Sequence, residues 1–347
     1  MRRRRRQRRR AAALRVGLLL VAAIAAVALR ESLGSDEAPD RPAAPRAPVA
    51  EASRPEPAGA DAPAPPGFRH AFAEVGGGVR LHYVIGGRGP AVALLHGFPQ
   101  TWFSWRKVMP ALAREHTVVA VDLRGAGRSS VPRSGYDKDT LAADVHRLLQ
   151  DLGLSRGASI VGHDLGAWTA YAYAREHRGE VRRLAFLEAG LPGFGLERSL
   201  DFSRPRQGIW HLAFFQQPGV PERLIRGRER YFVTEFLQPR RAEAGAFDAR
   251  ALEHYVSAYT PPPRLHAALE QYRAVYRDAA ANRARAGPRL AMPVLALGGE
   301  RATGGGPLVA MRRVAADVRG GVVPDAGHWL TEEQPVEMAS RLRDFLR

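Results

Sequence analysis

Residues 162–166, Gly-His-Asp-Leu-Gly, have the spacing of a nucleophile elbow with a carboxylate, Asp164, at its centre. An apolar run at 158–161 precedes them and a helical pattern follows from Ala167, which is the strand-turn-helix context that this motif requires. A carboxylate is ionised at neutral pH and can displace a leaving group from saturated carbon, which leaves an ester on the protein. Epoxides and alkyl halides are the electrophiles that suit such a nucleophile.

An ester of this kind needs a general base that activates water, and His328 is the candidate. It follows a short strand-like run late in the chain, and the order nucleophile, acid, late histidine is the order that accompanies the elbow. Two carboxylates could orient this histidine, because Glu188 comes after the apolar run 184–187 and Glu300 comes after the apolar run 293–297. By position alone, either carboxylate can serve.

Backbone N–H groups beside the elbow are candidates for an oxyanion hole. The apolar run 91–95 leads into a His-Gly-Phe-Pro-Gln loop at 96–100, which can aim the N–H of Phe98 at Asp164. The second donor would be the N–H of Leu165, the residue after the nucleophile. Together these groups would hold the carbonyl oxygen of the Asp164 ester while water attacks it. The histidine that opens the loop is interpreted as a residue that fixes the loop.

The elements that must position these residues alternate between strand-like apolar runs and helical patterns, as in α/β proteins. Between Glu188 and Met292 this alternation stops for roughly a hundred residues, which are rich in aromatic residues and arginine. A helical cap at about 194–287, inserted between two strands, fits the interruption. With 347 residues, 45% of them hydrophobic, the chain can bury the core of one domain of about 280 residues, predicted at 67–347.

Five segments resemble the α/β-hydrolase superfamily and, within it, the epoxide hydrolases. They are HGFPQ at 96–100, DLRGAGRSS at 122–130, GHDLGAW at 162–168, LEAGLPG at 187–193 and DAGHW at 325–329. The resemblance implies an α/β-hydrolase fold, which is a mostly parallel, doubly wound sheet with an inserted helical cap. It is similar to a secreted bacterial subgroup whose orienting acid is a glutamate after the sixth strand. Glu188 occupies that position, so the resemblance favours it over Glu300.

The same resemblance assigns two residues of the predicted cap. In the epoxide hydrolase subgroup a cap histidine and a cap tyrosine handle the leaving oxygen, and they map to His211 and Tyr272. Tyr276 lies four residues beyond Tyr272 on the same helical face, so it is an alternative proton donor. Packing roles for all three residues are the alternative interpretation.

Residues of the predicted cap and of the elbow also help to distinguish epoxide hydrolysis from dehalogenation. The two reactions share the ester intermediate. Fluoroacetate dehalogenases keep arginines one and four residues beyond the nucleophile and a tryptophan after the cap histidine, and haloalkane dehalogenases usually keep tryptophan directly after the nucleophile. This chain has Leu165, Trp168 and Leu212 at those places. The sequence therefore predicts an epoxide hydrolase that forms a vicinal diol. A hydrolytic dehalogenase is the first alternative, and a non-catalytic binding protein of the same fold is the second.

Composition limits the cofactors and partners. The chain has no cysteine, which excludes thiolate metal sites, disulfides and cysteine nucleophiles, and no His/Asp cluster has the spacing of a metal motif. We therefore expect neither a metal nor a cofactor. The formal net charge is +17, but the arginines are dispersed and form no stripe interleaved with aromatic residues, so nucleic-acid binding is not predicted. The predicted substrates are an epoxide and water, and the oligomeric state stays open.

The N-terminus reads as a separate unit. Residues 1–34 combine an arginine-rich start with an apolar run at 16–29, and a Pro/Ala-rich linker follows at 35–66. The run has the length of a signal h-region and is short for a spanning helix of about 20 residues. Arginines before it would stay in the cytoplasm. The sequence predicts a secreted or membrane-anchored protein with its catalytic domain outside the cytoplasm, and a mis-assigned start is the alternative.

Overall fold

The computed structural model describes residues 62–199, 210–238, 241–242 and 245–347 of the chain. The predicted signal or anchor segment 1–34 and most of the predicted linker 35–66 lie outside these residues. The predicted membrane contact and location therefore stay predictions. Among the described residues, no helix combines the length and the apolar character needed to cross a bilayer.

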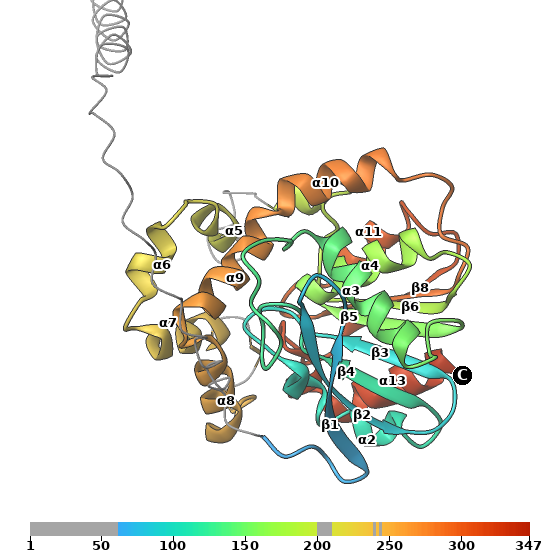
Figure 1. Cartoon of the computed structure of the whole chain (residues 1–347). Helices are drawn as coiled ribbons and strands as arrows, with labels where there is room; N and C mark the ends of the chain where they lie inside the picture. Colours follow the sequence, from blue (N-terminus) through green and yellow to red (C-terminus); the bar gives the residue numbers. More distant parts are fainter. Residues whose placement is uncertain (1–61, 200–209, 239–240, 243–244) are drawn as a thin grey trace, which may run out of the picture. The chain divides into compact units, whose positions relative to one another are not determined.

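One eight-stranded sheet forms the centre of the domain (Figure 1). Its spatial order is β1-β2-β4-β3-β5-β6-β7-β8. The strands are β1 (Phe68–Glu74), β2 (Arg80–Gly87), β3 (Ala91–Leu95), β4 (Thr117–Val121), β5 (Ala158–His163), β6 (Val181–Leu187), β7 (Val294–Gly299) and β8 (Val318–Val323). Strand β2 pairs antiparallel with β1 and β4, and all pairs from β4 to β8 are parallel. The predicted mostly parallel α/β sheet is confirmed.

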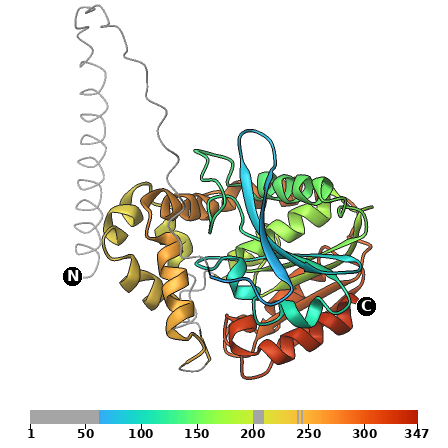
Figure 2. The same cartoon turned by 60° about the horizontal axis from the view of Figure 1, so that its bottom comes forward.

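The central strands are apolar along their whole length because helices cover both faces of the sheet. Every residue of β3, β5 and β7 is buried, which is the pattern of a parallel sheet enclosed on both sides. Helix α3 (Lys138–Asp151) packs against α4 (Leu165–Glu176) on one face, and α2 (Met109–Leu112) packs against α13 (Pro335–Leu346) on the other (Figure 2). The sheet is therefore doubly wound, as predicted.

The strand order places a topological switch point beside β3. Strand β4 follows β3 in the chain and lies on one side of it, whereas β5 lies on the other side. The connections that leave β3 and β5 therefore run to opposite faces, and the carboxyl ends of two such strands border an opening where α/β proteins bind ligands. The loop at 96–100 and Asp164 both begin at this opening.

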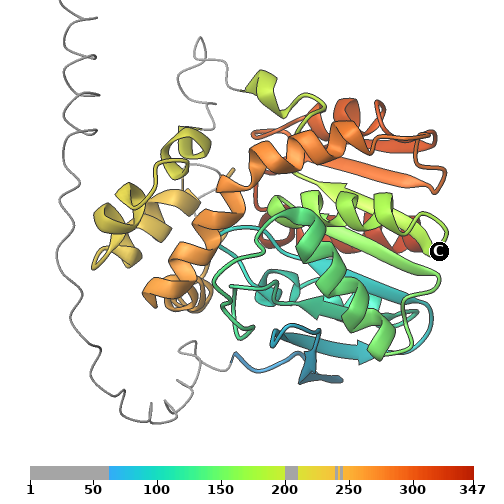
Figure 3. The ribbon, with the colours of Figure 1, turned by 45° about the horizontal axis from the view of Figure 1, so that its top comes forward.

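In the described part of the chain, six α-helices lie between β6 and β7, within the segment predicted as the cap, and the name cap is used below for them. They are α5 (Trp210–Phe215), α6 (Val220–Ile225), α7 (Glu229–Leu237), α8 (Ala249–Tyr259), α9 (Pro262–Arg273) and α10 (Val275–Ala284). Helices α6 to α9 stand together beside the sheet (Figures 1 and 3). The remaining elements are η1 (Trp102–Trp105), η2 (Leu196–Ser199), α11 (Gly306–Met311) and α12 (Leu330–Glu333).

Phe98 joins the cap to the sheet. Its ring contacts four cap rings at centroid distances of 5.0 to 6.0 Å, those of Phe215, Phe236, Tyr259 and Tyr272. Aromatic pairs in this range gain about 0.5–1.5 kcal/mol beyond their burial. The loop after β3 is thus packed under the cap on one side and faces the end of β5 on the other.

Candidate active site

Asp164 occupies a strained turn between β5 and α4. Its φ of 53° and ψ of −121° lie in a region that residues other than glycine rarely adopt. A Cβ atom on Gly162 would overlap the backbone of Gly166, and a Cβ atom on Gly166 would overlap the carbonyl of Leu95. The two glycines therefore let the strand and helix approach closely enough for the turn to form. The carboxylate of Asp164 projects from the sheet edge, and its side chain is 17% exposed.

His328 lies between Asp164 and Glu188. Its Nδ1 is 2.8 Å from Glu188 Oε2, and its Nε2 is 3.7 Å from Asp164 Oδ2. A carboxylate only accepts hydrogen bonds, so His328 donates from Nδ1 and directs Nε2 toward Asp164. The Glu188 side chain is fully buried, whereas that of His328 is 13% exposed. The structure brings these three predicted residues together, with one group buried and two open to solvent.

Glu188 is held from its other side as well. It also has a positive φ, 53°, directly after β6. Its Oε1 accepts hydrogen bonds from the Thr303 hydroxyl at 2.7 Å and from the backbone N–H of Gly299. These bonds stabilise a carboxylate that has no access to water. The alternative acid, Glu300, is exposed and accepts from the Asp325 N–H at 3.1 Å, so it does not reach His328 in the structure.

The predicted oxyanion donors lie at the elbow. The Phe98 N–H donates to Asp164 Oδ1 at 3.1 Å. Leu165 begins α4, so its N–H is one of the first-turn groups that have no acceptor within the helix. His96 holds the loop, because its Nδ1 donates to the Gly97 carbonyl at 2.9 Å and its Nε2 accepts the Leu123 N–H at 3.2 Å.

The predicted cap pair is buried near the same loop. The rings of His211 and Tyr272 are 5.6 Å apart, and the Tyr272 ring is 5.9 Å from that of Phe98. Tyr272 is 2% exposed, whereas Tyr276, the alternative donor, is 72% exposed. The structure therefore brings Tyr272 and His211 toward Phe98, and Tyr276 points to solvent.

The three positions that differ from dehalogenases offer no free N–H group from a side chain. Leu165 and Leu212 are buried apolar residues. The Trp168 indole N–H donates to the Gly190 carbonyl at 2.6 Å, so its hydrogen is already used.

Two residues of this neighbourhood were not identified from the sequence, and Glu333 is the first. Its Oε1 accepts the N–H of Trp329 at 2.8 Å, and its Oε2 accepts the N–H of Gly327 at 3.0 Å. Oε2 also accepts the N–H of Ala242, which lies between α7 and α8, at 2.5 Å. One carboxylate therefore accepts hydrogen bonds from the backbone N–H groups of the residues on both sides of His328. Trp329 is the N-cap of α12, so an acid in the next turn was a signal for a capping contact.

His163, which precedes Asp164, is the second residue that was not identified from the sequence. Its Nε2 is 2.8 Å from the carbonyl oxygen of His328, so Nε2 carries the hydrogen. Burial, with the charge of His328 adding to it, lowers the pKa of His163 to about 4. His163 is therefore neutral at pH 7 and supports the His328 loop without placing a positive charge beside it.

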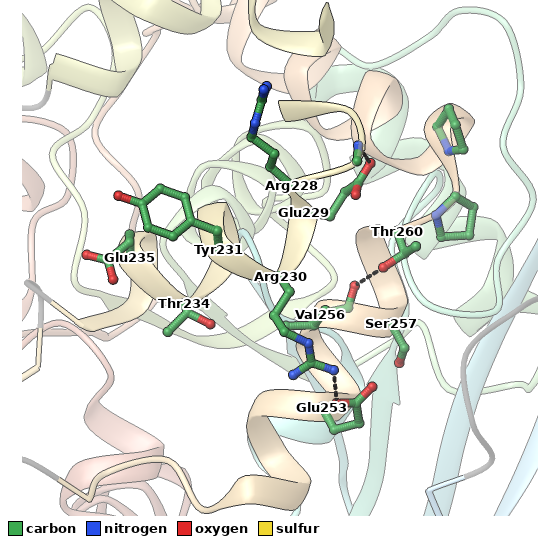
Figure 4. Close-up of a pocket in the computed structure, with 13 residues that line it drawn as sticks. Arg228, Glu229, Arg230, Tyr231, Thr234, Glu235, Glu253, Val256, Ser257 and Thr260 are labelled. Carbon is green, nitrogen blue, oxygen red and sulfur yellow. Dashed lines mark hydrogen bonds and ion pairs between the residues drawn. The ribbon is translucent and has the colours of Figure 1, made fainter. Parts of the chain in front are cut away.

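A surface hollow on the cap is separate from these residues. Figure 4 shows it between α7 and α8, lined by residues that include Tyr231, Thr234 and Ser257. The exposed Arg230–Glu253 ion pair lies at its edge. None of the residues lining it belongs to the candidate site.

Comparison with known proteins identifies the family of this chain and two similar enzymes. The profile of the alpha/beta hydrolase fold family matches residues 90–335. A soluble epoxide hydrolase from a Corynebacterium species is 35% identical over 262 residues, which cover 74% of this chain and 90% of that protein. A fluoroacetate dehalogenase from a Burkholderia species is 34% identical over 292 residues, which cover 81% of this chain and 94% of that protein.

A solved structure supports the same relationship. The crystal structure of wild-type Cfl2 from Burkholderia cenocepacia is similar to 82% of this chain and 98% of its own chain. The TM-score is 0.78 and the sequence identity is 40%. The likeness therefore extends over almost the whole of the described domain.

Replacing Glu333 by alanine is expected to loosen the His328 loop. Three N–H groups would lose their acceptor, at a cost of about 1–3 kcal/mol. We expect the amide hydrogens of Gly327 and Trp329 to exchange faster than in the parent protein. Glu337→Ala on α13, which removes a half-buried ion pair with Arg341, is the matched control and should leave both amides unchanged. Equal exchange in the two variants would contradict the assigned contacts.

The neutral state of His163 predicts a pH dependence of stability. Its pKa of about 4 in the folded protein lies below the ordinary 6.5, so between these values the unfolded chain binds a proton that the folded chain does not. The contribution is complete above pH 6.5 and is lost as the pH falls toward 4. His163→Gln keeps an N–H donor but does not titrate. Urea unfolding should show that the parent loses up to about 3 kcal/mol more than this variant over that range, and parallel losses would refute the assignment.

Proposed function

This chain belongs to the alpha/beta hydrolase fold family, and we propose that it is an epoxide hydrolase that works through an ester on Asp164. The proposal rests on one arrangement above all, a carboxylate on a nucleophile elbow that faces Nε2 of a histidine whose Nδ1 is bound to a buried glutamate. A carboxylate at the elbow favours displacement at saturated carbon over attack on an acyl group. The epoxide hydrolases among its relatives support the same substrate class.

In the first step, one oxygen of Asp164 attacks an epoxide carbon and the carbon–oxygen bond of the ring breaks. Oδ1 accepts the Phe98 N–H, so it stays as the carbonyl oxygen, and Oδ2 forms the new bond. The ring oxygen leaves as an alkoxide and needs a proton. Tyr272, with His211 beside it, supplies that proton, and the product of the step is a hydroxyalkyl ester of Asp164.

In the second step, His328 Nε2 takes a proton from water and the water oxygen attacks Cγ of the ester. Negative charge develops on Oδ1, where the N–H groups of Phe98 and Leu165 stabilise it. Glu188 stabilises the imidazolium that forms on His328. The tetrahedral intermediate then expels the alkoxide, which takes the proton from His328. The vicinal diol leaves, and the Asp164 carboxyl still carries the second proton of the water. Loss of that proton restores the Asp164 carboxylate, and return of a proton to the Tyr272 phenolate restores the proton donor.

Dehalogenation is the second candidate, because a fluoroacetate dehalogenase is 34% identical to this chain. A departing halide needs N–H donors or a positive charge in the site. The side chains of Leu165 and Leu212 supply neither, and the Trp168 N–H is bound to the Gly190 carbonyl. The buried hydroxyl of Tyr272 suits an alkoxide better, so the epoxide is preferred. A non-catalytic binding protein is the third possibility that the experiment must separate.

His328→Gln should trap the intermediate. Without the base, attack on the epoxide proceeds but hydrolysis of the ester is slowed by about 10²-fold or more. Incubation with a panel of epoxides should give diol with the parent protein. In the variant, intact-protein mass spectrometry should show a stable adduct whose peptide carries Asp164. Asp164→Asn is the control and should form no adduct.

The other outcomes of this panel separate the alternatives. Release of halide from haloalkanes or fluoroacetate without diol formation from epoxides would replace the proposal with dehalogenation. Absence of diol, halide and adduct across the panel would favour a non-catalytic protein.

Tyr272→Phe tests the proton donor against a matched tyrosine four residues away. Loss of the hydroxyl should lower the rate of adduct formation by about 10²-fold, because the alkoxide leaves unprotonated. Tyr276→Phe changes an exposed ring and should retain the parent rate. Single-turnover kinetics in the His328→Gln background measure this step alone. Equal rates for the two phenylalanine variants would remove Tyr272 from the mechanism.

A further inference from the structure

Two histidines and a glutamate converge outside the proposed catalytic site. His146 on α3, His177 just after α4 and Glu180 just before β6 offer ligand atoms that all lie within 4.8 Å of one another. His146 Nε2 and Glu180 Oε2 are 3.0 Å apart. The two imidazole rings lie face to face, with 3.6 Å between centroids and 8° between planes. In the part of the chain that the structure describes, no other group of histidine and acidic residues converges in this way.

The backbone holds these residues in place. The His177 N–H donates to the Tyr173 carbonyl at 2.9 Å, and the Glu180 N–H donates to the His177 carbonyl at 2.9 Å. The Glu180 carbonyl accepts the Gly157 N–H at 2.7 Å. Helices α3 and α4 pack side by side (Figure 3), which brings His146 to the other two residues. With the backbone fixed in this way, the three ligands need only side-chain movement to bind an ion.

The donor set suits a borderline divalent cation. Two imidazole nitrogens and one carboxylate oxygen form a three-ligand site that Zn²⁺ completes with water. Two ligand atoms about 2.1 Å from the same ion cannot be more than about 4.2 Å apart. The lone pair of a ligating imidazole lies in the plane of its ring, so the two rings stacked at 3.6 Å cannot both face one ion in this arrangement. Zn²⁺ binding therefore needs one imidazole to rotate out of the stack, together with a small shift of the ligand atoms. The Glu180 side chain is 33% exposed, so the ion can reach the cluster from solvent.

A neighbouring buried hydroxyl independently favours a ligand here. Tyr173 is fully buried, and its hydroxyl has no hydrogen-bond partner among the described residues. Its ring lies 4.9 Å from that of His177 and 5.6 Å from that of His146. A buried hydroxyl normally has a partner, and a water bound to the ion would provide one.

We propose that His146, His177 and Glu180 bind a divalent cation of the Zn²⁺ type. The ion ties α3 to the turn that connects α4 with β6. It lies apart from Asp164 and His328 and takes no part in the proposed hydrolysis. Its effect is on the stability of the fold, because the three ligands converge only in the folded chain.

Titration of the full chain with ZnCl₂, in protein prepared without a polyhistidine tag, tests the site. Calorimetry should give one ion per chain, and saturating Zn²⁺ should raise the Tm by at least about 3 °C. His146→Gln and His177→Gln should each weaken binding by at least about 10-fold. His266→Gln is the matched control, because His266 pairs with Glu222 at 2.9 Å but belongs to no such three-ligand group among the described residues.

Electron paramagnetic resonance of bound Cu²⁺ gives a second readout on the folded parent. Coupling to two imidazole nitrogens, reduced to one in whichever histidine variant folds, would support the site. Three results would overturn the proposal: no binding of Zn²⁺, an affinity that is unchanged in both histidine variants, or binding that is lost in His328→Gln and kept in His146→Gln. The last result would place the ion at the catalytic residues instead.

Discussion

The site depends on the backbone turn that raises Asp164 above the sheet. A φ of 53° at a residue with a side chain costs roughly 1 kcal/mol or more and persists only where the surroundings enforce it. Parallel pairing of β5 with β3 and β6 fixes the strand, and α4 begins at the next residue. Glu188 repeats the positive φ at the end of β6. Two carboxylates are thus presented at neighbouring strand ends, at the separation that one imidazole can bridge.

The cap and the His328 loop are parts of one packed unit. The Trp329 indole N–H donates to the carbonyl of Leu237, the last residue of α7, at 2.9 Å, and the Tyr255 hydroxyl on α8 donates to Glu332 at 2.6 Å. Glu333 binds peptides of the loop and of the cap at once. We therefore expect a change in cap packing to move the proposed base as well as the proposed proton donor. The two proposed steps are coupled through the same contacts.

The residues predictable from sequence are those whose role is encoded locally or by chain order. The elbow needs only its glycines and flanking pattern, and a late histidine follows from the order of the strands. Glu188 and Glu300 could not be separated by position, because both follow apolar runs. The choice depends on which strand end faces His328. Resemblance pointed to Glu188, and geometry now places it there.

Most of the residues missed from sequence act through tertiary contacts, whereas Glu333 makes two of its three contacts within six residues of itself. Glu333 and His163 bind backbone groups of the His328 loop, and the elbow and strand patterns do not encode those pairings. His146, His177 and Glu180 converge only because α3 packs on α4, so their spacing along the chain resembles no metal motif. The expectation that the protein holds no metal came from the lack of cysteine and from the spacing of histidine and acidic residues along the chain. A search for metal-motif spacing along the sequence does not detect ligands that lie on separate elements.

The charge on Asp164 also orders the two proposed steps. As an anion it attacks carbon readily, but its Cγ resists attack by water activated at Nε2, because the nucleophile would meet a negative charge. Alkylation converts the same group to a neutral ester, whose Cγ is electrophilic and whose Oδ1 is already held by the Phe98 N–H. In the structure, His328 Nδ1 is hydrogen-bonded to Glu188 Oε2 at 2.8 Å. One immobile base therefore serves only the second step, and no conformational switch is needed to keep water from acting first.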